Sequence, residues 1–298
     1  MEIGTFEQAI EGGEILRRAE EILPGTVFGN VRRICEQYGE EAGDCRKYDV
    51  YRLSSAGGDR ILKKTSRREA DNYERYLRRQ DFAAPAFYGF RADGSDVWIL
   101  TEYIAGHDLR EMTKEAARAA AESLAQIQNG FWGHPDTERF DVYRERIRRR
   151  GKYIQDEPVI GRAYRLFLER QEVCPRTLSH GDFLQWNAIG RGGRVYLIDW
   201  GFGGIMPYSL DIARFIAHAT ENRATFPFFM TRPQKRLFLD GVYERLKEKP
   251  DYPQYIRDIR LAVLNEYVEF IEADEDEDGW YARHAGTLAK EILRAEAP

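Results

Sequence analysis

Three side chains with oxygen donors stand close together in LSHGDFLQWNAIGRGGRVYLIDW, residues 178–200. Asp182 follows a glycine in a loop, Asn187 comes five residues later, and Asp199 ends an apolar run. Residues 188–199 predict a hairpin, because two short apolar segments turn over the glycine-rich stretch GRGG. A hairpin returns its far end toward its start, so we expect Asp182, Asn187 and Asp199 to converge.

These donors suit a magnesium ion and a chain of phosphates. Mg²⁺ loses its water reluctantly, so it is usually held by few protein oxygens and by substrate phosphates. Asn187 and Asp199 would supply one amide and one carboxylate oxygen. Asp182 would stay off the metal and would accept or orient the proton of a substrate hydroxyl. Phosphoryl transfer needs these groups, namely a positioned nucleophile and cations on the transferred group.

The same stretch resembles the aminoglycoside phosphotransferase and choline kinase superfamily, which has the protein-kinase-like fold. The resemblance is carried by three motifs in chain order: His180-Gly181-Asp182 with Asn187, then Ile198-Asp199-Trp200, then PYSLDIARF with Asp211. Three ordered motifs in one stretch carry more weight than any one alone. The resemblance implies that Asp182 is the catalytic base and that Asn187 and Asp199 bind magnesium. It also implies that Asp211 braces the catalytic loop.

Some of these residues have a simpler alternative role. Asp211 follows Ser209 and would also suit the first turn of a helix, where the helix dipole favours a carboxylate. His180 is expected to form structural hydrogen bonds rather than to transfer a proton. Trp186 and Trp200 are expected to pack against other side chains rather than to stack on a substrate.

The elements that must position these residues fall into two groups. YDVYRLSS and RILKKT predict a hairpin, and VWILTEYI predicts a further strand. From Gly106 onward most segments have helical spacing. The expected fold is α+β and protein-kinase-like, with two lobes. A small antiparallel β lobe, which binds nucleotide, would span residues 1–104. A larger, mainly helical lobe with the catalytic loop would span residues 105–298. An amphipathic helix is also expected over residues 6–23.

The resemblance assigns nucleotide binding to the first lobe. Lys63 and Lys64 would lie on opposite faces of a strand. The family pattern selects Lys63, with Lys64 as the second choice. Glu69 matches the acid of the family's following helix and would pair with Lys63. Its spacing from Ser66 equally fits a capping box.

TEYIAGHDL resembles the hinge between the lobes. Backbone groups from Glu102 to Ile104 would bind the base of ATP or GTP there, although the segment also fits an ordinary strand end. No G-x-G-x-x-G precedes the hairpin, where only Gly39 and Gly43 occur. The loop that covers the phosphates is therefore not identified.

The acceptor is expected to be a small molecule. Gly181 stands where protein kinases carry an arginine, and little chain separates Asp199 from Asp211. An acidic run near the C-terminus would attract a cationic acceptor if it lay at the site, and its candidate substrate-binding residues are Glu272, Asp274, Glu275 and Asp276. A solvated loop is the alternative.

These observations leave three candidate functions. The first is an aminoglycoside O-phosphotransferase that uses ATP or GTP and Mg²⁺. The second is a kinase of the same fold for choline, homoserine, a sugar or a nucleoside. The third is a nucleotide-binding regulatory protein without activity, which the complete set of Asp182, Asn187 and Asp199 disfavours.

Composition limits the partners and the compartment. The 298 residues carry a net charge of −5, which disfavours a general nucleic-acid binder. Three cysteines, Cys35, Cys45 and Cys174, are an odd and scattered set that fits a reduced cytoplasmic protein. No apolar run is long enough to span a membrane, and the N-terminus lacks the features of a signal peptide. We expect a cytoplasmic enzyme without an obligate protein partner.

Overall fold

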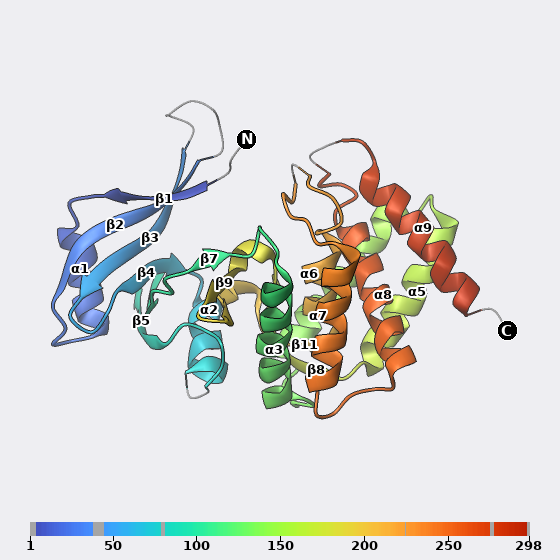
Figure 1. The fold of residues 1–298 in the computed structure, drawn as a ribbon, viewed down its shortest axis with the longest axis horizontal. Coiled ribbons are helices and arrows are strands. Elements are labelled where there is room, and N and C mark those ends of the chain that lie inside the picture. The colour runs from blue at the N-terminus through green and yellow to red at the C-terminus, as the bar shows by residue number, and fades with distance from the viewer. Residues whose placement is uncertain (1–3, 38–44, 79–80, 224, 275–276, 297–298) are drawn as a thin grey trace. The chain divides into compact units, whose positions relative to one another are not determined.

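The computed structural model describes residues 4–37, 45–78, 81–223, 225–274 and 277–296 (Figure 1). The chain divides into two compact units, each of which is described by itself. Residues 1–105 together with 199–201 form the first unit. Residues 106–198 together with 202–298 form the second unit.

The first unit is built on a six-stranded sheet with the order β1-β2-β3-β4-β6-β5, in which every pair of neighbours is antiparallel. Its strands are β1 (Gly4–Ala9), β2 (Phe28–Gln37), β3 (Cys45–Ser55), β4 (Arg60–Thr65), β5 (Phe87–Asp93) and β6 (Asp96–Glu102). The hairpin of β3 and β4 is the one predicted from the sequence. Leu53, Leu62 and Leu100 are fully buried in the sheet, and Ala19 of α1 (Gly13–Ile22) belongs to the same core cluster.

The N-terminal helix is shorter than predicted. Residues Gly4–Ala9 form β1, which pairs with β2, and the helix begins only at Gly13. Two adjacent glycines weaken a helix at this point, and strand pairing supplies hydrogen bonds that the local sequence does not show. A Cβ atom at Gly12 would also lie 2.3 Å from a methyl group of Val31 in β2. The close approach of the backbone to β2 at this position therefore requires glycine.

The predicted helix after β4 is present. It comprises α2 (Arg67–Asn72) and a π-helical continuation at Tyr73–Leu77. The hydroxyl of Ser66 caps its N-terminus by accepting a hydrogen bond from the Glu69 N–H at 3.3 Å. Tyr73 is buried and stacks on Phe87 of β5 with the ring centroids 5.2 Å apart.

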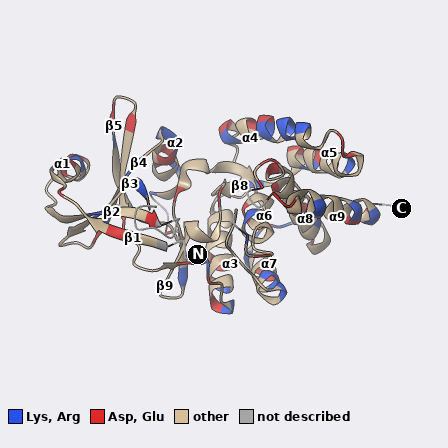
Figure 2. Ribbon diagram, turned by 90° about the horizontal axis from the view of Figure 1, so that it is seen from above, with Lys and Arg blue, Asp and Glu red and all other residues tan. Residues whose placement is uncertain are grey.

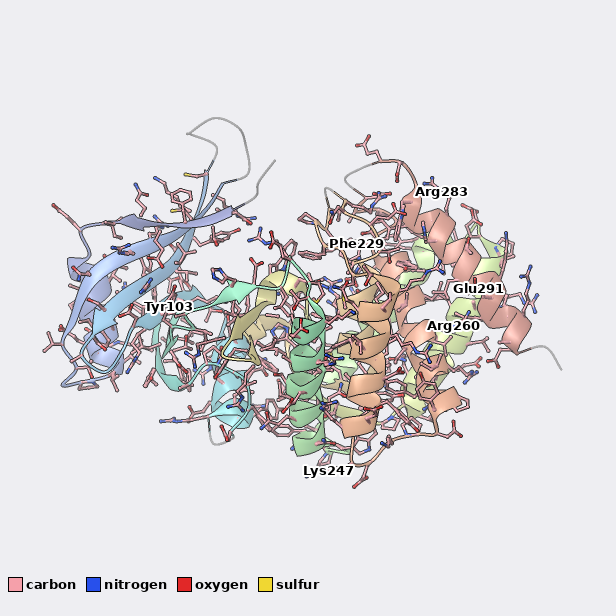
Figure 3. All side chains as sticks on the ribbon, in the orientation of Figure 1. Tyr103, Phe229, Lys247, Arg260, Arg283 and Glu291 are labelled. Carbon is pink, nitrogen blue, oxygen red and sulfur yellow. The ribbon has the colours of Figure 1, made fainter. Side chains whose placement is uncertain are left out.

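The second unit is mainly helical. Its helices are α3 (Lys114–Phe131), α4 (Glu138–Arg149), α5 (Pro158–Val173), α6 (Ser209–Ala217), α7 (Arg232–Arg245), α8 (Tyr252–Glu269) and α9 (Trp280–Ala295). Phe215 of α6 stacks on Phe183 and contacts Phe238 of α7, each at 4.5 Å between centroids. At the surface, an ion pair of 2.8 Å joins Arg260 of α8 to Glu291 of α9 (Figure 3).

Two small sheets position the predicted catalytic segment. One has the order β10-β9-β7 and contains β7 (His107–Asp108), β9 (Ala188–Arg191) and β10 (Arg194–Leu197). The other pairs β8 (Arg176–Ser179) with β11 (Gly204–Pro207). The antiparallel pair β9–β10 is the second predicted hairpin.

An antiparallel β unit and a mainly helical unit confirm the predicted α+β class. Among the described residues, none of the helices combines the length and the apolar character that crossing a membrane requires.

Candidate active site

Asp211 of α6 holds the loop that follows β8. Its carboxylate accepts hydrogen bonds from the Ser179 hydroxyl at 2.8 Å and from the backbone N–H groups of His180 and Gly181 at 2.7 and 2.9 Å. Burial raises the pKa of Asp211, whereas His180 and these donors oppose the rise. The sequence left bracing and a place at a helix N-terminus open for Asp211, and the residue makes these loop contacts from the first turn of α6, so both remain compatible with its position.

His180 and Gly181 fix the backbone immediately before Asp182. The buried His180 ring places Nε2 2.7 Å from the Ile198 carbonyl, and its Nδ1 accepts from the Asp182 N–H at 3.3 Å. Gly181 has a φ of 76°, and a Cβ atom there would lie 2.3 Å from the Phe202 carbonyl oxygen. Both ring nitrogens of His180 therefore lie within hydrogen-bonding distance of the backbone, and position 181 requires glycine.

Asp182 and Asn187 converge as the sequence predicted. The Asn187 amide nitrogen donates to the Asp182 carbonyl oxygen at 2.9 Å and to Asp182 Oδ2 at 3.0 Å. Both amide hydrogens are therefore directed at Asp182, and the Asn187 amide oxygen is the atom left to accept a donor or a metal ion.

Arg214 is a site residue that the sequence analysis missed. Its Nε and one terminal nitrogen donate to Asp182 Oδ1 at 3.1 and 2.7 Å, and its other terminal nitrogen donates to Glu266 at 2.7 Å. Burial lowers the pKa of Arg214, but Glu266, Asp182 and Glu269 together raise it above its usual value. A signal was present, because Arg214 lies one helical turn after Asp211 in PYSLDIARF and so shares its face of α6.

Glu266 of α8 extends this network away from Asp182. Burial alone would raise the pKa of Glu266, but Arg214 and His218 lower it to about 2. Burial lowers the pKa of His218 to about 4, so its ring is neutral at pH 7 and its Nε2–H donates to Glu266 at 3.1 Å. Arg214 is therefore held by carboxylates on two sides, and it fixes one oxygen of Asp182.

Asp182 opens into a cavity of about 220 Å³ within the second unit. Its walls come from α4, α6, α8 and β11 and from the segment after α4. Three arginines, Arg146, Arg150 and Arg214, line it together with Glu266 and Glu269. A small molecule in this cavity would lie beside the carboxylate of Asp182.

In the first unit, Lys63 pairs with two carboxylates. Its Nζ lies 2.9 Å from Glu69 Oε2 and 2.8 Å from Asp199 Oδ1. Burial lowers the pKa of Lys63, but the two carboxylates raise it above its usual value. Lys64 points to the other face and pairs with Asp96 at 2.7 Å. Glu69 combines both roles weighed from the sequence, since its N–H binds Ser66 and its carboxylate binds Lys63.

Asp199 adopts an uncommon backbone conformation. Its φ is 66°, in the left-handed region, and its side chain remains 48% exposed. Non-glycine residues in this region are uncommon and cluster at functional sites. The next residue, Trp200, is fully buried, and its carbonyl accepts from the Asn72 amide at 2.7 Å. Trp200 packs in the interior, as predicted.

Trp186 packs against an aromatic ring, and two backbone N–H groups of residues 102–104 are hydrogen-bonded. Trp186 contacts Phe228 edge-on at 4.8 Å between centroids, which fits the packing role expected for it. The N–H groups of Glu102 and Tyr103 bind the carbonyls of Ala86 and Asp59 at 2.8 and 3.1 Å. Within the described residues, the Ile104 N–H has no such bond.

The predicted acidic substrate-binding run is described only in part. Asp274 is almost buried and pairs with Arg223 at 2.8 Å. Glu272 is exposed, and neither residue lines the cavity beside Asp182. Glu275 and Asp276 lie outside the described residues, as do Gly39 and Gly43.

The structure thus forms two groups of predicted residues. In the second unit it brings Asp182 together with Asn187, and in the first it brings Lys63 together with Glu69 and Asp199.

Comparisons with known proteins show the family and the fold of the chain. The model of the phosphotransferase enzyme family matches residues 46–248. No curated protein matches the chain. One similar solved structure is a thermostable mutant of the aminoglycoside phosphotransferase APH(4)-Ia in a ternary complex with AMP-PNP and hygromycin B. It has a TM-score of 0.57 at 14% identity, with 95% of this chain and 99% of that chain covered.

Two further structures have different substrates in their names. Choline kinase from Cryptosporidium parvum Iowa II has a TM-score of 0.53 at 13% identity, covering 96% of this chain and 95% of its own. Amicoumacin kinase hAmiN, in complex with AMP-PNP, Ca²⁺ and Ami, has a TM-score of 0.55 at 12% identity, covering 95% and 93%. Likeness at such low identity shows the fold alone, and it confirms the predicted kinase-like architecture.

Proposed function

Because the chain belongs to the phosphotransferase enzyme family, we propose that it transfers the γ-phosphoryl group of ATP or GTP to a hydroxyl group of a small molecule. The observation that carries this proposal is the setting of Asp182. Its carboxylate lies on a braced loop at the wall of a cavity, with one oxygen fixed by Arg214. A carboxylate in such a setting can orient a hydroxyl group and accept its proton.

The proposed step is direct in-line transfer. The acceptor oxygen forms a bond to the γ-phosphorus while the bond between that phosphorus and the β–γ bridging oxygen breaks. The electron pair of the broken bond leaves with the nucleoside diphosphate, and the hydroxyl proton passes to Asp182. Arg214 and Asn187 keep the Asp182 carboxylate in one orientation during the step.

The nucleotide-binding residues are proposed on chemical grounds. Lys63, oriented by Glu69, would bind the α- and β-phosphates, and the Ile104 N–H would donate to the base beside Glu102. Two of the similar structures hold AMP-PNP, which supports a nucleoside triphosphate as the phosphate donor.

Magnesium suits the remaining oxygen donors. Asn187 has an amide oxygen not used by Asp182, and Asp199 has a half-exposed carboxylate. One amide and one carboxylate are a typical protein share for Mg²⁺, which takes its other ligands from phosphates and water. Bound there, the ion would neutralise charge on the β- and γ-phosphates.

Two acceptor classes follow from different observations. The sequence favours an aminoglycoside-type acceptor, and hygromycin B in one similar structure supports that class. The charges of the cavity favour the second candidate, a kinase for a smaller hydroxyl-bearing metabolite. The acidic residue Asp274 is already paired with Arg223 and lies outside the cavity walls.

The test measures nucleoside diphosphate release with Mg²⁺ and ATP or GTP, across aminoglycosides, choline, homoserine and simple sugars. Asp182→Asn should lower turnover by about 100-fold or more, the usual share of a general base, while nucleotide still binds. Asp156→Asn, at an exposed aspartate of the same unit, is the matched control and should keep activity. Loss of nucleotide binding in Asp182→Asn would show that the role assigned to Asp182 is wrong. Intact nucleotide binding with no turnover of any acceptor would favour a regulatory protein.

A further inference from the structure

We propose that the acceptor carries an anionic group, a carboxylate or a phosphate, and that Arg146 binds this group in the cavity beside Asp182. The inference rests on the phosphoryl transfer proposed above, because it names the acceptor class for that site. It is carried by the way charges are paired around the cavity.

The carboxylates of the cavity wall are all engaged. Their donors are Arg214 for Asp182 and Glu266, Arg150 for Glu269, and a hydroxyl with two backbone amides for Asp211. An ammonium group entering the cavity would have to compete with guanidinium groups that already form these ion pairs. A polycation would therefore bring charge into the cavity without finding an unengaged carboxylate among the described residues.

Arg146 is in the opposite situation. It is half-buried in the last turn of α4, and its Nε is shielded from solvent and forms no hydrogen bond. Within the described part of the chain its guanidinium makes no ion pair, and it lies over the face of the Tyr143 ring at 5.9 Å from the centroid. Arg150 and Arg214, the other arginines of the cavity, are both ion-paired.

Arg144 of the same helix also has a buried Nε without a hydrogen bond, but its guanidinium forms ion pairs, which Arg146 lacks among the described residues. Basic residues recur along α4 (Figure 2), and its neighbours Arg144 and Arg148 pair with carboxylates. A buried guanidinium nitrogen without an acceptor is unfavourable. An anionic group that supplies the acceptor would form charge-assisted hydrogen bonds, which are among the stronger polar contacts in proteins. Arg146 therefore fits a ligand anion better than a purely structural role.

A set of matched polyols tests this assignment. D-glucitol is neutral, D-gluconate adds a carboxylate, and D-glucitol 6-phosphate adds a phosphate to a comparable chain of hydroxyl groups. Kanamycin serves as the polycation. Binding of each is measured by titration calorimetry on the full chain, with MgADP at saturation so that anions do not occupy the nucleotide site.

We expect the wild type to bind at least one of the two anions about 10-fold or more tightly than D-glucitol, the effect of a charge-assisted contact. The anion that binds more tightly identifies the group as carboxylate or phosphate. Arg146→Gln should reduce the preference to about 2-fold or less, and Arg146→Lys should restore part of it. Arg149→Gln removes an exposed arginine of the same helix and should leave the preference unchanged.

Three results would overturn the assignment: no preference for either anion over D-glucitol, a preference that survives in Arg146→Gln, or tighter binding of kanamycin than of both anions. Binding is read without turnover, so the two proposals fail separately. If the protein prefers anions but phosphorylates no acceptor, the Arg146 site is supported and the proposed phosphotransferase activity is contradicted. If it phosphorylates a neutral alcohol without preferring anions, the activity is supported and the Arg146 site is contradicted.

Discussion

Replacing Arg214 with methionine should destabilise the second unit and stop catalysis by separate routes. Burial opposes ionisation of Glu266, and Arg214 is the largest influence that lowers its pKa, from 4.5 to about 2. At about 1.4 kcal/mol for each tenfold change in the ionisation equilibrium, this lowering of the pKa corresponds to about 3 to 4 kcal/mol of stability. We therefore expect Arg214→Met to lower the free energy of unfolding by about 3 to 4 kcal/mol at pH 7, as is usual when one partner of a buried pair is removed.

The pH dependence gives this prediction a sign. The folded pKa of Glu266 lies below the unfolded one, so the stabilisation is complete above about pH 4.5 and is lost as the pH falls toward 2. Urea unfolding of the wild type should therefore show a decline over this range. In Arg214→Met the decline should be smaller or reversed, because Glu266 no longer has the guanidinium that keeps it ionised.

A second substitution separates stability from catalysis. Arg214→Met combined with Glu266→Gln leaves no unpaired charge at position 266, so most of the lost stability should return. Turnover should not return, because Asp182 still lacks the two hydrogen bonds from Arg214. Arg236→Met, at an arginine whose side chain is 82% exposed, is the matched control. The reasoning is wrong if Arg214→Met costs no more stability than Arg236→Met, or if turnover recovers together with stability.

Three further variants test the loop, the metal and the nucleotide. Gly181→Ala should lower kcat by about 10-fold or more, because its Cβ would lie 2.3 Å from a backbone oxygen at the base of the catalytic loop. Gly193→Ala has a similar φ of 78° with no atom within 4 Å, so equal effects of the two variants would point to backbone strain alone. Asp199→Ala should weaken the magnesium dependence of nucleotide binding, and an unchanged dependence would remove Asp199 from the metal site. Lys63→Ala should raise the KM for the nucleotide by about 10-fold, because it removes a charged contact to the phosphates. Lys64→Ala, on the other face of the strand, should change this KM by no more than about 2-fold. Equal effects of the two variants on KM would contradict the choice of Lys63.

The parts of the site that the sequence predicted are those fixed by local spacing. Asp182 and Asn187 are five residues apart, and a single short loop brings them into contact. The hairpin of β9 and β10 follows from two β-forming segments around Gly192 and Gly193, both of which have positive φ. Lys63 and Glu69 are six residues apart across one strand-to-helix turn, so their pairing also follows from local spacing.

Contacts between distant segments could not be predicted in this way. Residues of β1 have a helical pattern in isolation, but they pair with β2 across a helix and a turn. Arg214 and Glu266 are 52 residues apart, and the local sequence around either residue does not predict the other as its partner. The contact of Arg214 with Glu266 depends on the packing of α6 against α8.

The same limit applies to runs of charge in the sequence as a guide to the acceptor. The acidic run near the C-terminus suggested an attraction for cations, yet Asp274 is neutralised by Arg223 from 51 residues away. Arg146, in contrast, stands among basic neighbours in the last turn of α4. In the structure Arg144 and Arg148 pair with carboxylates, whereas Arg146 pairs with none among the described residues. A ligand responds to the charges that remain after such pairs have formed, because a paired group has already exchanged its water for a protein partner. The choice between a cationic and an anionic acceptor therefore depends on which cavity residues are paired, and only Arg146 among the cavity's described arginines keeps its charge available.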